Sequence, residues 1–124
     1  MGLMHPTSRS FSYAFQGIKT AFINEPNLRI HTVFAIIALF LGIYLDISTI
    51  EWLFLLFTIT WVISLELLNT VLEAIVNLVS PEVSPYAKIA KDVSAACVLI
   101  SAFLSMVVGL IIFAPRIIGL VFYS

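Results

Sequence analysis

Four polar side chains recur along one otherwise apolar segment, and their types suit chemistry. Within the run 52–79, which has no other charge, they are Glu66, Asn69, Glu73 and Asn77. On an ideal helix they fall within roughly 80° of one another, so they line one face. A carboxylate near the centre of a membrane-spanning helix costs about 2.5–3.5 kcal/mol on insertion scales. We therefore expect a chain that keeps two glutamates here to use them.

Other ionisable groups reach the same depth from neighbouring segments. Counted from the start of the run at 52, Glu66 lies about 21 Å in, and Glu73 lies about 31 Å in, at the boundary of a ~30 Å hydrocarbon core. Lys91 and Asp92 begin the next apolar segment at that boundary, and Glu25 precedes the first one. Carboxylates suit Mg²⁺, a lysine suits phosphate, and a carboxylate in partly apolar surroundings can accept a proton from a hydroxyl. The set predicts phosphoryl transfer at the membrane surface.

These side chains also have structural interpretations. Glu66 and Glu73 could form ion pairs with Lys88 or Lys91 and hold the helices together. Asn69 could be an interhelical hydrogen-bonding residue, which is common and worth roughly 0.6–2 kcal/mol. The sequence has no GxxxxGK[ST] phosphate loop and no kinase glycine loop, so neither standard device for holding ATP is present. Spacing alone leaves these interpretations open.

The composition is that of an integral membrane protein. The chain has 124 residues, 61% of them hydrophobic and 10% charged, and its mean hydropathy is +1.12. A soluble domain of this size cannot bury so much apolar surface. The net charge of −1 gives no reason to expect a nucleic-acid partner. The length suits one domain, residues 1–124.

Three apolar segments are long enough to span a bilayer. They cover about residues 30–49, 52–79 and 93–113, the last closed by Pro115, and each reaches the ~20 residues that a spanning helix needs. The link at 46–51 predicts a tight turn between antiparallel helices, with Asp46 and Glu51 as solvated residues that have no further role. The link at 80–90 predicts a polar loop.

The N-terminal stretch, about residues 10–25, is amphipathic rather than fully apolar. Phe11, Phe15, Ile18 and Phe22 recur at helical spacing, with polar residues on the other faces. Such a helix lies in the membrane interface or packs on the end of the helix bundle, and both arrangements remain open. Glu25, at the end of this stretch, could simply be a loop residue.

Positive charges predict the orientation in the membrane. Three precede the first span and two lie between the second and third: Arg9, Lys19, Arg29, Lys88 and Lys91. The positive-inside rule then puts the N-terminus, the second link and the candidate site in the cytoplasm. Arg116 opposes this with one charge against five.

Two motifs on the predicted second and third spans resemble those of a known family. Glu66-Leu-Leu-Asn69-Thr-Val-Leu-Glu73-Ala-Ile-Val, followed by Ala90-Lys91-Asp92, resembles the signature of the prokaryotic diacylglycerol kinase family, which includes the undecaprenol kinases. Ala21-Phe-Ile-Asn-Glu25 resembles its N-terminal motif. The likeness covers about residues 12–115 without obvious gaps.

The resemblance implies an all-α integral membrane protein with three transmembrane helices and an N-terminal amphipathic surface helix. It implies a homotrimer in the bacterial plasma membrane that transfers the γ-phosphate of ATP to a lipid alcohol with Mg²⁺. Glu66 would be the general base and Asn69 would orient the reacting groups. Glu25 and Glu73 would hold the metal, with Glu25 serving a neighbouring subunit's Glu73.

The resemblance also implies the binding contacts. The ATP-binding residues would be Tyr13, Glu25, Glu73, Glu82, Lys91 and Asp92. The lipid substrate would lie against Glu66 and Ala95.

The chain departs from the family pattern at two places. The family usually has an aspartate where this chain has Asn77, which leaves the role of Asn77 open. After Lys91-Asp92 the diacylglycerol kinases resemble Gly-Ser, whereas this chain has Ser94-Ala95. Ala95 and the segment from Gly109 to Pro115 resemble the undecaprenol kinases. We therefore expect undecaprenol as substrate, giving undecaprenyl phosphate, with diacylglycerol, giving phosphatidic acid, as the alternative.

Small residues at four-residue spacing bear on assembly. Ala38 and Gly42 in the first span, and Ser101, Ser105 and Gly109 in the third, let helices approach closely. The approach can be between subunits or within one.

Two functions of other classes compete with the kinase. A small proton-coupled multidrug transporter has about this length and an intramembrane glutamate, but it needs four spans and lacks a Lys-Asp pair at an interface. A non-enzymatic membrane subunit predicts that Glu66→Gln and Glu73→Gln change stability or assembly and no activity.

Overall fold

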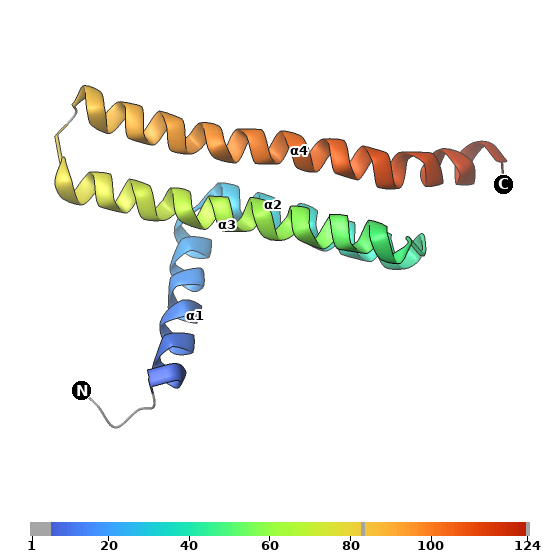
Figure 1. Cartoon of the computed structure of the whole chain (residues 1–124), viewed down its shortest axis with the longest axis horizontal. Coiled ribbons are helices and arrows are strands. Elements are labelled where there is room, and N and C mark those ends of the chain that lie inside the picture. Colours follow the sequence, from blue (N-terminus) through green and yellow to red (C-terminus); the bar gives the residue numbers. More distant parts are fainter. Residues whose placement is uncertain (1–5, 83, 124) are drawn as a thin grey trace.

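The described part of the chain is a hairpin of two long helices with two shorter ones, one lying beside the hairpin and the other projecting from it (Figure 1). The computed structural model describes residues 6–82 and 84–123. The helices are α1 (Pro6–Asn24), α2 (Pro26–Tyr44), α3 (Thr49–Val79) and α4 (Pro85–Tyr123). The last three are long and apolar enough to cross a membrane. The expected all-α membrane architecture is confirmed.

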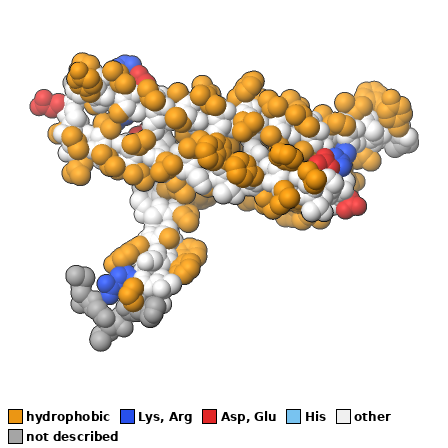
Figure 2. Space-filling model, in the orientation of Figure 1, with side chains coloured by type: hydrophobic (Ala, Val, Ile, Leu, Met, Phe, Trp, Pro, Cys, Tyr) orange, Lys and Arg blue, Asp and Glu red, His pale blue; other side chains and the backbone are white. Residues whose placement is uncertain are grey.

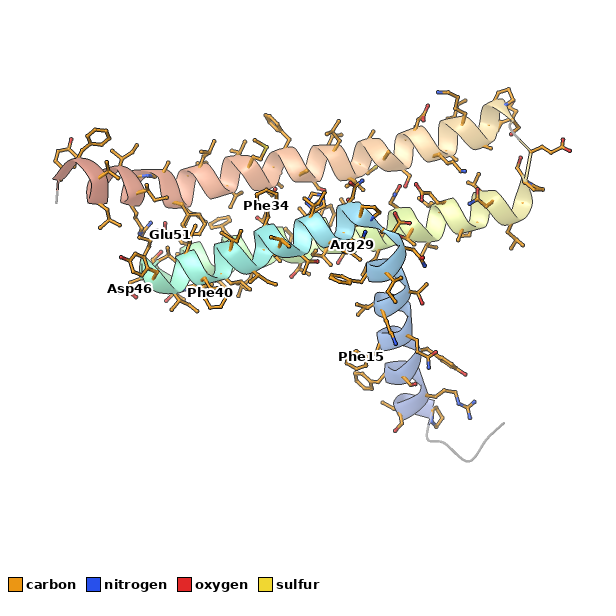
Figure 3. All side chains as sticks on the ribbon, turned by 180° about the vertical axis from the view of Figure 1, so that it is seen from behind. Phe15, Arg29, Phe34, Phe40, Asp46 and Glu51 are labelled. Atoms are coloured by element: carbon orange, nitrogen blue, oxygen red, sulfur yellow. The ribbon has the colours of Figure 1, made fainter. Side chains whose placement is uncertain are left out.

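A sharp corner separates α1 from α2. Glu25 has extended backbone and stands directly before Pro26, the first residue of α2, where proline is tolerated because its missing N–H needs no helical partner. Arg29 donates to the carbonyls of Phe22 at 2.9 Å and Ile23 at 2.7 Å, which satisfies the last carbonyls of α1. Figure 3 shows Arg29 at this corner. The sequence therefore ends one helix, begins another, and ties the two together.

The apolar stripe of α1 does not pack on its own bundle. Phe11, Phe15, Ile18 and Phe22 are all exposed, and Ala21, near the corner, is the buried residue of this helix. Figure 3 shows Phe15 on the part of α1 that has left the bundle. This apolar face is therefore left for the membrane interface or for another subunit, so both arrangements remain open.

The turn between α2 and α3 is tighter than the sequence predicted. The first spanning helix ends at Tyr44 rather than near 49, because Asp46 adopts the left-handed conformation with φ 50° and the N–H of Ile47 donates to the carbonyl of Gly42. Ser48 and Glu51 then form a reciprocal capping box that starts α3.

Glu51 is not the solvated turn residue that the sequence suggested. Its carboxylate accepts two hydrogen bonds of 2.6 Å from the guanidinium of Arg116, and its side chain is 25% exposed. This pair joins the turn to α4, at the end of the bundle where Figure 3 labels Asp46 and Glu51. Sequence separation hid the pair, since α4 had been expected to end before Arg116.

Helix α4 extends beyond its predicted limits at both ends. It begins at Pro85, so the polar link shrinks to residues 80–84, because the hydroxyl of Ser84 accepts from the N–H of Ala87 and caps the helix. It also continues through Pro115 to Tyr123 rather than closing there. A proline inside a helix removes one hydrogen bond without necessarily ending the helix.

The bundle is held mainly by α3 against α4, with α2 packed on α3 and touching α4 little. A core of Ile47, Leu55, Ile112 and Phe113 closes the end near the α2–α3 turn. There a Cβ on Gly42 would lie 2.7 Å from the indole of Trp52, so Gly42 and Trp52 pack together within the chain. Apolar side chains cover the visible face of the bundle, with charges near its ends (Figure 2).

Candidate active site

The antiparallel register of α2 and α3 is fixed at the level of the deeper glutamate. The Nε2 atom of His31 lies 3.3 Å from the Oε1 atom of Glu66. Six residues back from His31 is Glu25, and six residues on from Glu66 is Leu72, next to Glu73. Since both helices rise about 1.5 Å per residue, Glu25 and Glu73 share a level about 9 Å beyond Glu66. Glu66 thus lies below the α1–α2 corner, and Glu73 lies level with it.

Glu66 is the most notable buried group of the bundle. Its side chain is 2% exposed, and no hydrogen-bond donor within the described residues reaches its Oε1 atom. His31 is near, but its N–H is not aligned for a hydrogen bond, so the two side chains are close without being bonded. Glu25 and Glu73 are close enough for their negative charges to act on Glu66. Burying such a carboxylate costs stability, so its presence here indicates a function.

Glu66, Asn69, Glu73 and Asn77 form a polar stripe along α3, and their burial falls steadily toward the α3–α4 link. Glu66 is buried, Asn69 and Glu73 are half-buried, and Asn77 is exposed. The stripe therefore runs from a dry end to a wet end, as the count of depth predicted. A lipid group and a water-soluble group can reach opposite ends of one helix face.

A hydrogen-bonded chain positions the middle of the stripe. The hydroxyl of Ser94, on α4, donates to Oδ1 of Asn69 at 2.7 Å. The amide nitrogen of Asn69 then lies 3.4 Å from Oε1 of Glu73 and donates to it. Ser94 is 6% exposed, so this link between α3 and α4 is shielded from water. It fixes which way the Asn69 amide points.

The lysines do not pair with the glutamates of the stripe. Lys91 donates to Oδ1 of Asn77 at 2.7 Å, and Lys88 forms an ion pair with Asp92 one turn along α4. Within the described residues, the structural interpretation in which Lys88 or Lys91 neutralises Glu66 or Glu73 is therefore wrong. Asn77, whose role was open, holds the lysine that was expected to contact phosphate.

Three predicted contact residues stay apart from this cluster. Tyr13 is on α1 with its side chain 63% exposed, and Glu82 and Ala95 are exposed as well. In the described part of one chain, none of the three hydrogen-bonds to the stripe.

The carboxylates present fit a magnesium ion bound together with a nucleotide. No cluster of three or more metal-binding side chains occurs among residues 6–82 and 84–123. Mg²⁺ commonly uses one or two carboxylates plus substrate phosphates and waters. Glu25 and Glu73, at one level, supply that number.

An apolar groove of about 450 Å³ runs along α2, α3 and α4 from the site toward the opposite end of the bundle. His31 is at one end of its lining and Phe113 is at the other; Phe34, Val62 and Gly109 lie between them. Because α2 barely touches α4, the groove stays open. Its lining suits a hydrocarbon chain whose head lies near Glu66.

The sequence matches a known family over most of its length. The family model for prokaryotic diacylglycerol kinase matches residues 12–113. An undecaprenol kinase of Bacillus subtilis is 38% identical over 109 residues, which are 88% of this chain and 89% of that protein. A diacylglycerol kinase of Synechocystis sp. is 38% identical over 112 residues, 90% of this chain and 64% of that protein. A diacylglycerol kinase of Escherichia coli is 28% identical, covering 80% of this chain and 81% of that protein.

The chain belongs to the prokaryotic diacylglycerol kinase family. It is therefore a membrane lipid kinase, as the sequence motifs predicted. Three helices of spanning length among the described residues agree with this family, whereas a multidrug transporter of this size needs four. The transporter and the non-enzymatic subunit are set aside.

Two residues that contact the polar residues of α3 were missed by sequence reasoning. Ser94 was noted for family comparison and not for its hydrogen bond to Asn69. His31 was given no role in the sequence analysis, yet a signal was available. The link at 46–51 is centred between 48 and 49, and folding the chain about that point aligns position 31 with position 66.

Proposed function

We propose that this lipid kinase phosphorylates undecaprenol, using MgATP, at a site on the cytoplasmic side of the membrane. The observation that carries the proposal is the buried carboxylate of Glu66 beside the end of an open apolar groove. A lipid alcohol in that groove would present its hydroxyl to Glu66 while its chain stays in apolar surroundings.

The chemistry follows from the two ends of the stripe. The lipid hydroxyl oxygen forms a bond to the γ-phosphorus of ATP, and the bond from that phosphorus to the β,γ-bridging oxygen breaks, releasing ADP. Glu66 accepts the hydroxyl proton as the oxygen attacks. Mg²⁺, bound by Glu25 and Glu73, would neutralise phosphate charge. Lys91, held by Asn77, adds a point charge beside the phosphates.

The remaining nucleotide contacts are part of the same proposal. Asp92 lies next to Lys91, while Tyr13 and Glu82 would approach the nucleotide from α1 and from the α3–α4 link. These three are exposed, so a ligand or a second subunit can reach them, although Asp92 also pairs with Lys88.

Undecaprenol is favoured over diacylglycerol by residues on α4. Ala95 stands where the diacylglycerol kinases resemble serine, and it presents a methyl group rather than a hydroxyl to a bound lipid. The B. subtilis undecaprenol kinase matches along nearly its whole length, whereas the Synechocystis diacylglycerol kinase is longer than the matched region.

The cytoplasmic orientation is supported by the charges. Five lysines and arginines belong to the end that carries α1 and the α3–α4 link. Arg116, which opposed this orientation in the sequence, is paired with Glu51 at the other end. The positive-inside rule counts lysines and arginines, so the balance remains five charges against one.

A homotrimer is the third element of the proposal. At most 28% of any spanning window is buried within one chain, so large apolar faces remain for lipid or for other subunits. If sites are shared between subunits, Glu25 of one subunit would complete the metal site at Glu73 of another.

The test is an ADP-release assay on purified protein in detergent micelles with MgATP. Undecaprenol and diacylglycerol are supplied separately at equal mole fraction. We expect kcat/KM to be at least about tenfold higher with undecaprenol, which corresponds to roughly 1.4 kcal/mol. Faster turnover of diacylglycerol would reverse the substrate assignment, and no turnover with either lipid would reject the proposed reaction.

A further inference from the structure

One ionisable side chain next to Glu66 has no part in the reaction as described. His31, on α2, places its imidazole beside Glu66, with Nε2 3.3 Å from Oε1. His31 is itself only partly exposed and lies at the lining of the groove. Its position therefore touches both the proposed base and the proposed path of the lipid.

Glu66 lacks a hydrogen-bond donor at Oε1 within the described part of the chain, and His31 is close enough to supply one. The Oε1 atom of Glu66 has no hydrogen-bond donor among the described residues, and the other charged groups acting on it, Glu25 and Glu73, are negative. Without a donor, no hydrogen bond fixes the orientation of this buried carboxylate. No lysine or arginine of the described chain forms an ion pair with it.

We propose that His31 is a positioning residue for the general base: its Nε2–H donates to Oε1 of Glu66 and holds the carboxylate toward the lipid hydroxyl. This inference rests on the proposed kinase reaction and concerns the same site. A small rotation of the imidazole aligns the N–H with the oxygen, since the two atoms are already 3.3 Å apart. The other Glu66 oxygen stays available to the substrate.

Reach distinguishes this role from a general need for a polar side chain. The amide nitrogen of glutamine extends about as far from the backbone as histidine Nε2, whereas that of asparagine stops short. His31→Gln therefore keeps the donor near Glu66, His31→Asn keeps an amide but withdraws it, and His31→Leu removes it. Thr32→Val is the control, because the Thr32 hydroxyl donates to the carbonyl of Leu28 within its own helix.

The experiment compares kcat, KM for the lipid and KM for ATP in all five proteins, together with thermal unfolding in detergent. We expect kcat of the leucine and asparagine variants to fall about 10–100-fold, part of the roughly 10²–10⁴ that general-base catalysis supplies. KM for ATP should change little. The glutamine variant should stay within about threefold of the parent, and the threonine control should match the parent.

Two results would overturn the assignment. One is a leucine variant with the parent kcat. The other is equal kcat in the glutamine and asparagine variants, which would mean that reach to Glu66 is irrelevant; this comparison remains valid if the leucine variant fails to fold. Absence of lipid-dependent turnover in the parent protein would instead refute the proposed function itself, so the two failures are distinguishable.

Discussion

Removing the Ser94 hydroxyl should slow the kinase without unfolding it. Ser94 donates across the α3–α4 interface to Asn69, which in turn donates to Glu73. In Ser94→Ala the Asn69 amide loses the bond that fixes its direction, and its contact with Glu73 is already long at 3.4 Å. The proposed metal ligand then loses its orienting neighbour.

The size of the effect can be estimated from the bond. Interhelical hydrogen bonds in membranes average about 0.6 kcal/mol and reach about 1.7 kcal/mol. If all of that stabilises the transition state, kcat falls about 3–18-fold. Unfolding should become easier by no more than the same amount.

The matched control is Ser101→Ala on the same helix. Ser101 is 1% exposed, but its hydroxyl donates to the carbonyl of Val98 in α4 and, among residues 6–82 and 84–123, forms no hydrogen bond to another helix. Steady-state kinetics and thermal unfolding are measured for both variants. We expect similar, small changes in stability and a loss of kcat in Ser94→Ala alone.

A double-mutant cycle with Asn69→Ala tests whether Ser94 affects kcat through Asn69. If Ser94 acts through Asn69, removing the serine from the Asn69→Ala protein has no further effect on kcat. Equal kcat in the two serine variants, or additive losses in the cycle, would refute the reasoning.

Three further changes test other contacts. Arg116→Leu leaves Glu51 without its guanidinium partner and should lower the unfolding temperature. Replacing Glu51 by glutamine in the same protein should recover part of the loss. No recovery would mean that the lost ion pair is not the cause. Arg29→Ala removes the hydrogen bonds to the last carbonyls of α1, so the corner between α1 and α2 loosens. KM for ATP should then rise by up to about tenfold. An unchanged KM would mean that the corner keeps its geometry without Arg29. Gly42→Ala places a methyl group against Trp52 and should lower the free energy of unfolding by about 1–3 kcal/mol. Trp52→Phe in the same chain should reverse part of that loss. A Gly42→Ala protein of unchanged stability would contradict the close packing of these two residues.

Helix type and number were predictable because apolar run length and period determine them. The three spans and the amphipathic helix were expected from the sequence, and the structure has them. The boundaries were less accurate where a capping device decided the outcome. Ser84 started α4 early, and the left-handed Asp46 ended α2 early. Such devices depend on a few backbone angles rather than on hydropathy.

The cross-helix partners were harder to predict than the helices. The stripe on α3 follows from spacing, but Lys91 with Asn77 and Ser94 with Asn69 depend on how α4 is rotated against α3. Rotation is set by side-chain packing along the whole interface, which spacing does not specify. The pairing of His31 with Glu66 is different, because a short turn fixes the register of two antiparallel helices.

On the proposed function, the distance between Glu66 and Glu73 gives each glutamate a different substrate. Glu66 and Glu73 are seven residues apart, two helical turns or about 10.5 Å on one face. A lipid hydroxyl at Glu73 would draw its chain out of the apolar groove, and ATP at Glu66 would lose the hydration of its charged phosphates. On the proposed function, neither substrate moves that far. The nucleotide would be held at the half-exposed level of Glu73, with its phosphate chain reaching toward the buried level of Glu66, where the lipid hydroxyl attacks the γ-phosphorus directly. Asn69, one turn from each glutamate and oriented by Ser94, lies between the two levels.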